Sequence, residues 1–382
     1  MRIGVTTFGA DGGKSGISQY LINLMRAFAA APEGNDFEVA TYGDERSIFV
    51  PDSPHIASFS TADSHRGTVQ DIMWHQTALP GICRSHRYDV LFLPAGNRRL
   101  PAMSPCPTVG TVHDFSSIHV KDKYDRSHLF YVTKVLPALV RRLTRVIAVS
   151  KSARKDIVEF AGVPEERVTV IPNAVDHSVY FPDDPAAAFN RLSAKMAIQK
   201  PYLLYLSRLE HPGKNHVRLL QAFEKLKQQS GIPHQLVLAG SDWDRAAEIH
   251  EAAEKLRCKE DVLFTGFVAS EDVADLYRAA DIMVFPSLVE GFGIPILEAM
   301  ACGAPVVCSG VSSMPEVASD AALYFEPSDV DSIFESLSRV IENDDLKTDL
   351  RSRGLKRAAQ FTWTESAVKT LSVLRQAAEE AR

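Results

Sequence analysis

The stretch from Phe285 to Val307 reads FPSLVEGFGIPILEAMACGAPVV. The apolar run IMVF ends at Phe285 and predicts a buried strand. The loop that follows carries two glycines on either side of Phe292, and Pro295 suits the first turn of a helix that begins there. The next apolar run, Pro305–Cys308, predicts a second strand. This order of strand, loop, helix and strand is the one from which parallel sheets covered by helices are built.

The loop and the start of this helix form a candidate anion site. Glycines let backbone N–H groups approach an oxyanion, and a helix N-terminus adds a partial positive charge, so a diphosphate suits this position. Glu298 lies on the helix and can accept hydrogen bonds from two adjacent hydroxyl groups, as on a ribose. Glu290 stands at the loop entrance and would face the group beyond the phosphates. The segment alone is also compatible with an ordinary turn that carries acidic surface residues.

The same alternation of strands and helices extends through the rest of the chain. In the first half, strands are predicted at 1–7, 39–41, 90–93, 108–112, 146–149 and 168–171, with helices at 17–30, 130–143 and 152–160. In the second half, strands are predicted at 202–206, 235–239, 262–264, 282–285 and 305–308, with helices at 217–228, 246–256, 270–279, 295–301 and 330–341. The polar stretch Asp176–Pro185 separates the halves and is typical of a linker. We therefore expect an α/β protein of two doubly wound domains.

Two cations follow the first strand of the second half. In open parallel sheets, ligands bind beyond the carboxyl ends of the strands. Arg208 and Lys214 lie there, six residues apart, and two such cations can clamp a diphosphate. The alternative is a pair of surface charges on a loop. The HPG sequence between them leaves the reach of Lys214 open.

Composition narrows the class of protein. The chain has 382 residues, 45% hydrophobic and 24% charged, as an ordinary globular protein of two or three domains would. The first residues, MRIGVTTFG, are too short an apolar run for a signal peptide, and no run approaches the ~18 apolar residues of a spanning helix. A cytoplasmic location is therefore expected. Five cysteines without a C-x-x-C pair predict neither a disulfide framework nor a zinc site.

Charge is unevenly distributed. Residues 186–382 hold 22 basic and 28 acidic residues and so carry the entire net charge of −6, whereas residues 84–155 hold 14 basic and 4 acidic ones. A basic face suits an anionic membrane or a phosphorylated acceptor, and a solvated surface is the alternative. The basic residues include Arg84, Arg87, Arg98, Arg99, Lys121, Lys123, Arg126, Lys134, Arg141, Arg142 and Arg145.

Glu290 and Glu298 stand in an E-x7-E pattern inside EGFGIPILEAMACGAPVV, and here the chain resembles the family 4 glycosyltransferases of the GT-B architecture. Four further segments resemble the family's pattern: SRLEHPGKN at 207–215, IPNAVD at 171–176, SSMPEV at 312–317 and TVHD at 111–114. The resemblance covers roughly residues 1–20, 108–180 and 200–330. Together these motifs are specific for the family and say little about which sugar moves.

The resemblance implies a domain organisation. Two Rossmann-like domains would face each other across a cleft. Residues 1–182 would form an acceptor-binding domain and residues 183–363 a nucleotide-sugar-binding domain. The C-terminal helix, 364–382, would pack back on the first domain.

The resemblance also implies roles for individual residues. The catalytic set would be Glu290, His113, Arg208 and Lys214, with His113 on the donor sugar. The donor would be bound by Arg208, Lys214, Glu290, Gly291, Phe292, Gly293, Ile294 and Glu298. The early loop GADGGKSGISQY fits the G-x-G-x-x-G form of nicotinamide-binding proteins poorly, and in the family it contacts the acceptor or the transferred group. The acceptor residues would be Gly13, Gly16 and Asp114.

The family implies retention of anomeric configuration without a metal or other cofactor. No carboxylate pair of the hydrolase kind is evident, and a nucleoside diphosphate leaves readily once its charge is met. We therefore expect front-face attack by the acceptor hydroxyl. Asp242 and Asp244 are the nearest approach to a metal-binding D-x-D motif, and we interpret them as capping or surface residues.

The expected partners are a nucleotide sugar and a saccharide, with no nucleic acid. The motifs resemble most the bacterial surface-polysaccharide transferases, which favours GDP-mannose as donor and a lipid-linked saccharide acceptor at the inner face of the cell membrane. A UDP-sugar such as UDP-glucose is the second candidate for the donor. The competing hypotheses for the whole protein are a sugar-nucleotide epimerase of the same architecture, a non-catalytic binding subunit, and a two-lobed periplasmic-type binding protein.

Overall fold

The computed structural model describes residues 1–13, 15–119, 129–199 and 201–380, and the chain divides into two compact units. The first unit is built mainly from residues up to Ala174 and from the C-terminal segment that starts at Thr362. The second unit is built mainly from Val175–Phe361. The division falls after Ala174 rather than after residue 182, because the backbone of residues 179–181 is hydrogen-bonded to a helix of the second unit.

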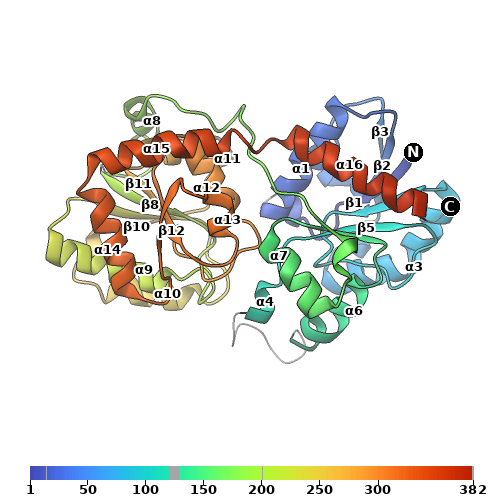
Figure 1. The fold of residues 1–382 in the computed structure, drawn as a ribbon, viewed down its shortest axis with the longest axis horizontal. Coiled ribbons are helices and arrows are strands. Elements are labelled where there is room, and N and C mark those ends of the chain that lie inside the picture. Colours follow the sequence, from blue (N-terminus) through green and yellow to red (C-terminus); the bar gives the residue numbers. More distant parts are fainter. Residues whose placement is uncertain (14, 120–128, 200, 381–382) are drawn as a thin grey trace. The chain divides into compact units, whose positions relative to one another are not determined.

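The first unit contains a seven-stranded parallel sheet with the strand order β3-β2-β1-β4-β5-β6-β7 (Figure 1). The central strands β4 and β5 are buried along their whole length, as expected for strands covered on both faces. The strands are β1 (Arg2–Thr6), β2 (Asp36–Tyr42), β3 (Ile56–Thr61), β4 (Val90–Leu93), β5 (Thr108–Val112), β6 (Arg145–Ala148) and β7 (Val168–Val170).

Helix α1 (Gly16–Ala30) shows why the helices of this unit form where they do. Ser15 caps its N-terminus in a capping box with Ser18, which satisfies backbone N–H groups that have no partner inside the helix. Apolar side chains spaced by three and four residues then face the core: Tyr20, Leu21, Leu24, Met25 and Phe28. The other helices are α2 (Arg46–Phe49), α3 (Thr68–His86), α4 (Ser116–His119), α6 (Leu136–Val140) and α7 (Lys151–Asp156).

Helix α16 (Trp363–Glu380) closes the first unit from the far end of the sequence. It packs beside α1 and against β4 and β5 (Figure 1). The Ser366 hydroxyl donates to the Pro172 carbonyl at 2.8 Å, and the Trp363 ring lies 5.8 Å from that of Tyr20. The last helix is therefore part of the core of the unit in which the chain begins.

The second unit contains a six-stranded parallel sheet with the order β10-β9-β8-β11-β12-β13. Its strands are β8 (Tyr202–Leu206), β9 (Gln235–Ala239), β10 (Val262–Gly266), β11 (Ile282–Phe285), β12 (Val306–Ser309) and β13 (Ala322–Phe325). Its helices are α8 (Pro185–Ser193), α9 (His216–Lys225), α10 (Ala246–Glu254), α11 (Ser270–Ala279), α12 (Ile294–Ala301), α13 (Met314–Ala318), α14 (Val330–Ile341) and α15 (Asp344–Ala358).

This strand order is that of the Rossmann fold, in which the order reverses between the first and fourth strands. Here those strands are β8 and β11, so the ligand crevice of the fold lies at their carboxyl ends. Both sheets are parallel and connected by helices. The predicted class of two doubly wound α/β domains is therefore confirmed.

Candidate active site

Two adjacent loops of the second unit carry most of the predicted donor residues. Residues 207–215 follow β8 and residues 286–293 follow β11, and the two strands pair in the sheet. The Leu288 N–H donates to the Gly213 carbonyl at 2.9 Å, which ties the loops together. Across them, Lys214 Nζ donates to Glu290 Oε1 at 2.7 Å. The structure thus joins two residues that the sequence presents as separate contributors.

The ion pair keeps Lys214 charged. Burial acts to lower the pKa of Lys214, but the Glu290 carboxylate outweighs it and raises that pKa above its usual range. The Tyr205 hydroxyl donates to the Lys214 carbonyl at 2.9 Å and lies 3.1 Å from the Ser287 hydroxyl. Because Tyr205 is buried, these contacts fix the backbone of both loops beneath the ion pair.

Arg208 lies on the same loop as Lys214 but has other partners. Its guanidinium stacks over the Trp243 ring, 4.7 Å from the ring centre, and lies 3.7 Å from the Glu210 carboxylate. The backbone N–H of Trp243 donates to the Leu209 carbonyl at 3.0 Å. From the sequence, residues 242–244 are expected to be surface or capping residues. Nothing in the sequence pattern indicates that the loop after β9, which carries them, contacts the loop after β8.

Two serines hold the loop after β11. The hydroxyls of Ser312 and Ser313 donate to the Glu290 carbonyl at 2.7 and 2.9 Å. The Ser313 hydroxyl, which has a single proton to share, also lies 2.8 Å from the Phe292 carbonyl. The sequence places these serines in a family motif without a role, and their contacts show that they shape the backbone around Glu290.

The glycine before α12 has a backbone conformation that requires it. Gly293 has φ +100°, and an added Cβ would lie 3.3 Å from the Ile296 side chain. The Phe292 side chain is buried, with its ring 6.1 Å from that of Phe361, so it packs inside the unit. Gly291 and Ile294, the remaining predicted donor residues of this turn, are partly exposed.

Glu298 lies on α12 between two tyrosines. The Tyr277 hydroxyl donates to Glu298 Oε2 at 3.1 Å, and the Tyr180 hydroxyl is close enough to the carboxyl group to affect its pKa. Burial raises the pKa of Glu298 to about 7, and the two tyrosine hydroxyls oppose the rise. The carboxyl group therefore changes charge near neutral pH. The sequence predicts Glu298 but gives no sign of Tyr277, and it suggests Tyr180 only as a residue of the linker.

His113, in the first unit, is a buried neutral imidazole. Its Nε2 lies 2.8 Å from the Pro94 carbonyl, which can only accept, so Nε2 carries the proton and Nδ1 remains an acceptor. Burial lowers the pKa of His113 to about 4. The Tyr20 ring packs edge-on at 4.9 Å. An acceptor nitrogen of this kind can receive a hydrogen bond from a sugar hydroxyl.

The early glycine loop contains two different kinds of glycine. Gly13 has φ +93°, and its carbonyl accepts a hydrogen bond from Gln19 at 3.2 Å. Gly16 is the first residue of α1, and an added Cβ there would meet no atom within 4 Å. The backbone conformation therefore explains Gly13 but not Gly16. Asp114, next to His113, is half-buried.

A cavity of about 490 Å³ opens in the first unit beyond β1 and β2. It takes Gly9 and Gly12 from the glycine loop, whereas Gly13, Gly16 and Asp114 are not among its lining residues. Four carboxylates and two guanidinium groups line it: Asp11, Asp44, Glu45, Asp71, Arg66 and Arg99. Such a wall offers many acceptors and several donors to a polyhydroxylated molecule.

The charged groups of this cavity are bonded to one another. The Tyr42 hydroxyl donates to the Asp71 carboxylate, and Arg99 Nε donates to the same carboxylate at 3.3 Å. Arg66 donates to Glu45 at 3.3 Å. The positions of the carboxylates are therefore fixed by their neighbours.

Two family matches together account for most of the chain. Residues 14–179 match the family described as Glycosyltransferase Family 4, and residues 189–357 match the family described as Glycosyl transferases group 1. The O-antigen chain mannosyltransferase B of Escherichia coli is 33% identical over 264 residues, which are 69% of this chain and 69% of that protein. The chain belongs to the family 4 glycosyltransferases.

Other relatives of this glycosyltransferase match it over different lengths. The serotype-specific mannosyltransferase WbdA of Escherichia coli is 30% identical over 270 residues, and these span 69% of this chain but 32% of WbdA. The structure of Anabaena HepE in complex with UDP and glucose has a TM-score of 0.75, covers 98% of this chain and 100% of HepE, and is 21% identical. The enzyme therefore has the GT-B fold.

The described part of this glycosyltransferase contains neither a cluster of His, Cys, Asp and Glu suited to a metal ion nor a helix long and apolar enough to cross a membrane. Asp242, one half of the D-x-D sequence, lies 2.9 Å from His250 Nε2. This contact agrees with its interpretation as a surface residue.

Ion pairs partly neutralise the basic stretch 84–155 of the glycosyltransferase. Arg98 pairs with Asp11 at 2.7 Å, Arg99 with Asp71, and Arg145 with Glu380. Other members are exposed: Arg84, Arg87, Lys134, Arg141 and Arg142. Lys121, Lys123 and Arg126 lie outside the described residues.

Proposed function

We propose that this glycosyltransferase transfers a hexose, with retention of configuration, from a nucleotide-diphosphate sugar bound in the second unit. The observation that carries the proposal is the Lys214–Glu290 ion pair at the carboxyl ends of β8 and β11, beside the glycine turn that opens α12. Cations and the N-terminus of a helix at this position suit a diphosphate. Glu298, one turn further along α12, suits the ribose hydroxyls.

The ion pair gives each partner a role in donor binding. An ammonium group has three donors, so Lys214 can hold a phosphate oxygen while it still faces Glu290. The phosphate then shares the positive charge, and the Glu290 carboxylate can accept hydrogen bonds from the sugar. Arg208 supplies a second cation from the Trp243 face.

The proposed reaction is a front-face substitution that needs no metal or other cofactor. The bond between the anomeric carbon and the phosphate oxygen breaks while the acceptor oxygen bonds to the same carbon from the same face. The acceptor proton passes to the departing phosphate oxygen. Charge that develops on the diphosphate is stabilised by Lys214, Arg208 and the N–H groups of residues 291–293, and carbocation-like charge on the sugar by Glu290.

We propose GDP-mannose as the donor, because two relatives that are 33% and 30% identical are named mannosyltransferases. A UDP-sugar is the second candidate, because HepE, of the same fold, binds UDP and glucose.

The proposed acceptor is a saccharide that reaches the first unit. The cavity beyond β1 and β2 supports this assignment, since four carboxylates and two arginines suit hydroxyl groups better than a phosphate. His113 would accept a hydrogen bond from the donor sugar at Nδ1, and Gly13, Gly16 and Asp114 would border the acceptor. A lipid-linked acceptor in bacterial surface-polysaccharide synthesis, met at the inner face of the cell membrane by a cytoplasmic enzyme, fits the exposed basic residues.

The first test is a thermal-shift panel of GDP, UDP, dTDP and ADP with the matching sugar nucleotides. A ligand at 100 times its Kd stabilises the folded state by about 2.7 kcal/mol, so one base should raise Tm by several degrees and the others less. The Glu298→Ala variant is the control, and it should lose most of the shift. If no diphosphate raises the Tm of the wild-type protein, the proposed donor site is wrong.

A further inference from the structure

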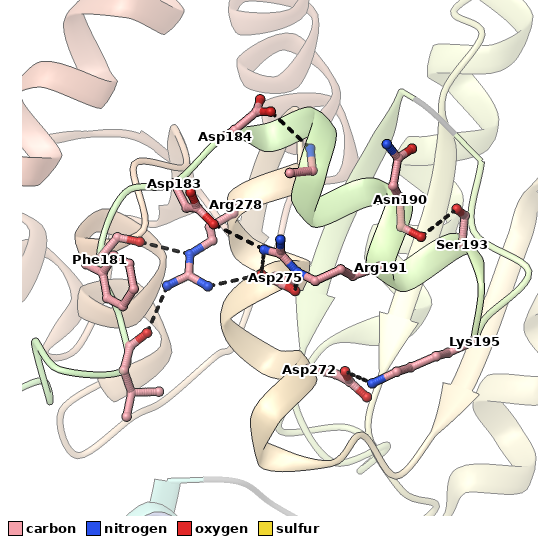
Figure 2. A network of polar contacts seen from close by, with 12 residues as sticks. Phe181, Asp183, Asp184, Asn190, Arg191, Ser193, Lys195, Asp272, Asp275 and Arg278 are labelled. Atoms are coloured by element: carbon pink, nitrogen blue, oxygen red, sulfur yellow. Dashed lines mark hydrogen bonds and ion pairs between the residues drawn. The ribbon is translucent and has the colours of Figure 1, made fainter.

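The segment that leads into the second unit is held by one arginine. Arg278, on α11, donates from Nη2 to the Val179 carbonyl at 3.0 Å and from Nε to the Phe181 carbonyl at 2.9 Å (Figure 2). Its guanidinium also stacks on the Phe181 ring at 4.3 Å. The two carbonyls belong to the residues immediately before and after Tyr180. Arg278 therefore holds the backbone on both sides of that tyrosine.

Arg278 is itself fixed by a network of charges. Its Nη1 donates to Asp275 Oδ1 at 3.0 Å, and Arg191 of α8 makes two hydrogen bonds to the same carboxylate, at 2.7 and 2.6 Å (Figure 2). Arg191 also donates to Asp183 at 3.2 Å. The side chains of Asp275 and Arg278 are buried, so the contact between these two is weakly screened. The guanidinium is thereby kept in one orientation.

Tyr180 is the residue that this arrangement aims. Its ring lies 6.2 Å from that of Tyr277, whose hydroxyl donates to the Glu298 carboxylate, and the Tyr180 hydroxyl acts to lower the pKa of the same carboxyl group. The entering segment is thus attached to α11 by Arg278, and Tyr180 lies beside the tyrosine that holds Glu298.

We propose that Arg278 is a positioning residue for donor binding, which holds the Tyr180 hydroxyl on Glu298 and so keeps that carboxylate oriented to receive the two hydroxyls of a nucleotide ribose. The proposal rests on the proposed function, which gives Glu298 this role. Arg278 acts through Tyr180. Its contribution therefore differs from that of the loop cations, which meet the phosphates.

The arrangement also sets the pH at which Glu298 accepts hydrogen bonds. The groups that face it are Tyr180 from the entering segment, Tyr277 from α11 and Cys302 from its own helix. Burial raises the pKa of Glu298 to about 7, and the tyrosine hydroxyls hold it down. Loss of the Tyr180 hydroxyl therefore raises the pKa further. The carboxylate needed for ribose binding is then lost at a higher pH.

The test measures the Kd of GDP and of UDP by titration calorimetry between pH 5.5 and 8.5. In Tyr180→Phe and Arg278→Lys, the Kd of the nucleotide that binds should rise about 10-fold at pH 7. The pH midpoint of binding should move up by about one unit. Lysine keeps the charge beside Asp275 but cannot bond both carbonyls. Glu298→Gln should weaken binding and abolish its pH dependence over this range.

Lys195→Met is the matched control. It removes the 2.6 Å ion pair with Asp272 in the same part of the unit but no contact of residues 179–181 (Figure 2). Its Kd and midpoint should equal those of the wild type.

Each outcome decides one claim. If Glu298→Gln weakens binding while Tyr180→Phe leaves both Kd and midpoint unchanged, the positioning role is wrong. If Glu298→Gln itself binds as the wild type does, the ribose site of the proposed function is wrong. If Arg278→Lys does not fold, Tyr180→Phe, which leaves the charge network intact, still decides between them.

Discussion

At the scale of single residues, the two glutamates of the E-x7-E pattern have different surroundings and should have different roles. Glu290 faces the Lys214 ammonium, where charge would develop during transfer, and Glu298 faces two tyrosine hydroxyls on a helix. Position in the pattern could not show this difference, because the partners are far away in sequence: Lys214 lies 76 residues before Glu290. Only the pairing of β8 with β11 brings them together.

Glu290→Gln tests the role of the first glutamate. The change keeps the shape and removes the charge. The value of kcat should fall about 10²- to 10³-fold, as when a group that stabilises transition-state charge is lost. The donor Kd should stay the same or fall, because Lys214 is then available to the diphosphate. Steady-state kinetics and calorimetry with the donor found in the thermal-shift panel measure both.

The comparison variant is Glu298→Ala, for which the order of effects should reverse, with a large rise in Kd and a smaller loss in kcat. A purely affinity-based loss of similar size in both variants would contradict this division of roles.

At the scale of elements, the sequence predicts the central strands well, but it misses β3 and β13, each at the edge of its sheet, and several helices. The continuous apolar runs of β8, β9 and β11 predict these strands, because central parallel strands are buried on both faces. The sequence does not predict α3, because Pro80 interrupts a mostly polar pattern. It does not predict α15, because this helix buries few side chains and so shows little apolar periodicity. Helix α8 was missed because it begins at Pro185, where the linker was expected to end.

The residues that start two helices, Gly16 of α1 and Gly293 before α12, provide a test of why glycine is needed. Gly293→Ala forces a side chain into a positive-φ conformation near Ile296 and should cost about 1–3 kcal/mol of stability and weaken donor binding. Gly16→Ala meets no atom and should stabilise the protein by about 0.4–1 kcal/mol. If Gly16 borders the acceptor, the same variant should raise the acceptor KM.

Chemical denaturation and acceptor kinetics on the two variants separate these effects. A Gly16→Ala enzyme with wild-type acceptor KM would remove Gly16 from the proposed acceptor site, whatever its stability.

At the scale of the whole molecule, a net charge of −6 conceals an exposed basic and apolar surface on one helical segment. The exposed residues of 129–142 lie in a helical stretch that ends at Val140 and in the turn that follows it: Leu129, Phe130, Lys134, Ala138, Arg141 and Arg142. Phe130 is 63% exposed. An aromatic side chain among cations is the composition with which helices bind the surface of an anionic bilayer.

Replacement of Arg141 and Arg142 by alanine should therefore weaken binding to vesicles that contain anionic lipid. Each basic residue near such a surface contributes about 1 kcal/mol, so the double variant should bind about 30-fold more weakly. Neutral vesicles should show no comparable difference, because the attraction depends on surface charge. Vesicle co-sedimentation at low and high salt measures the effect, which salt should reduce.

The matched control is Lys255→Ala with Arg257→Ala, which removes two exposed positive charges from the second unit. Both double variants change the net charge by the same amount. A difference between them therefore reports where the charges lie and not how many were removed. Equal losses in the two double variants would mean that only the net charge matters. Unchanged binding in Arg141→Ala with Arg142→Ala would show that this surface does not contact the membrane. Binding that fails only in that variant, together with normal transfer to a soluble saccharide, would show that the basic face brings the enzyme to its acceptor and takes no part in the chemistry.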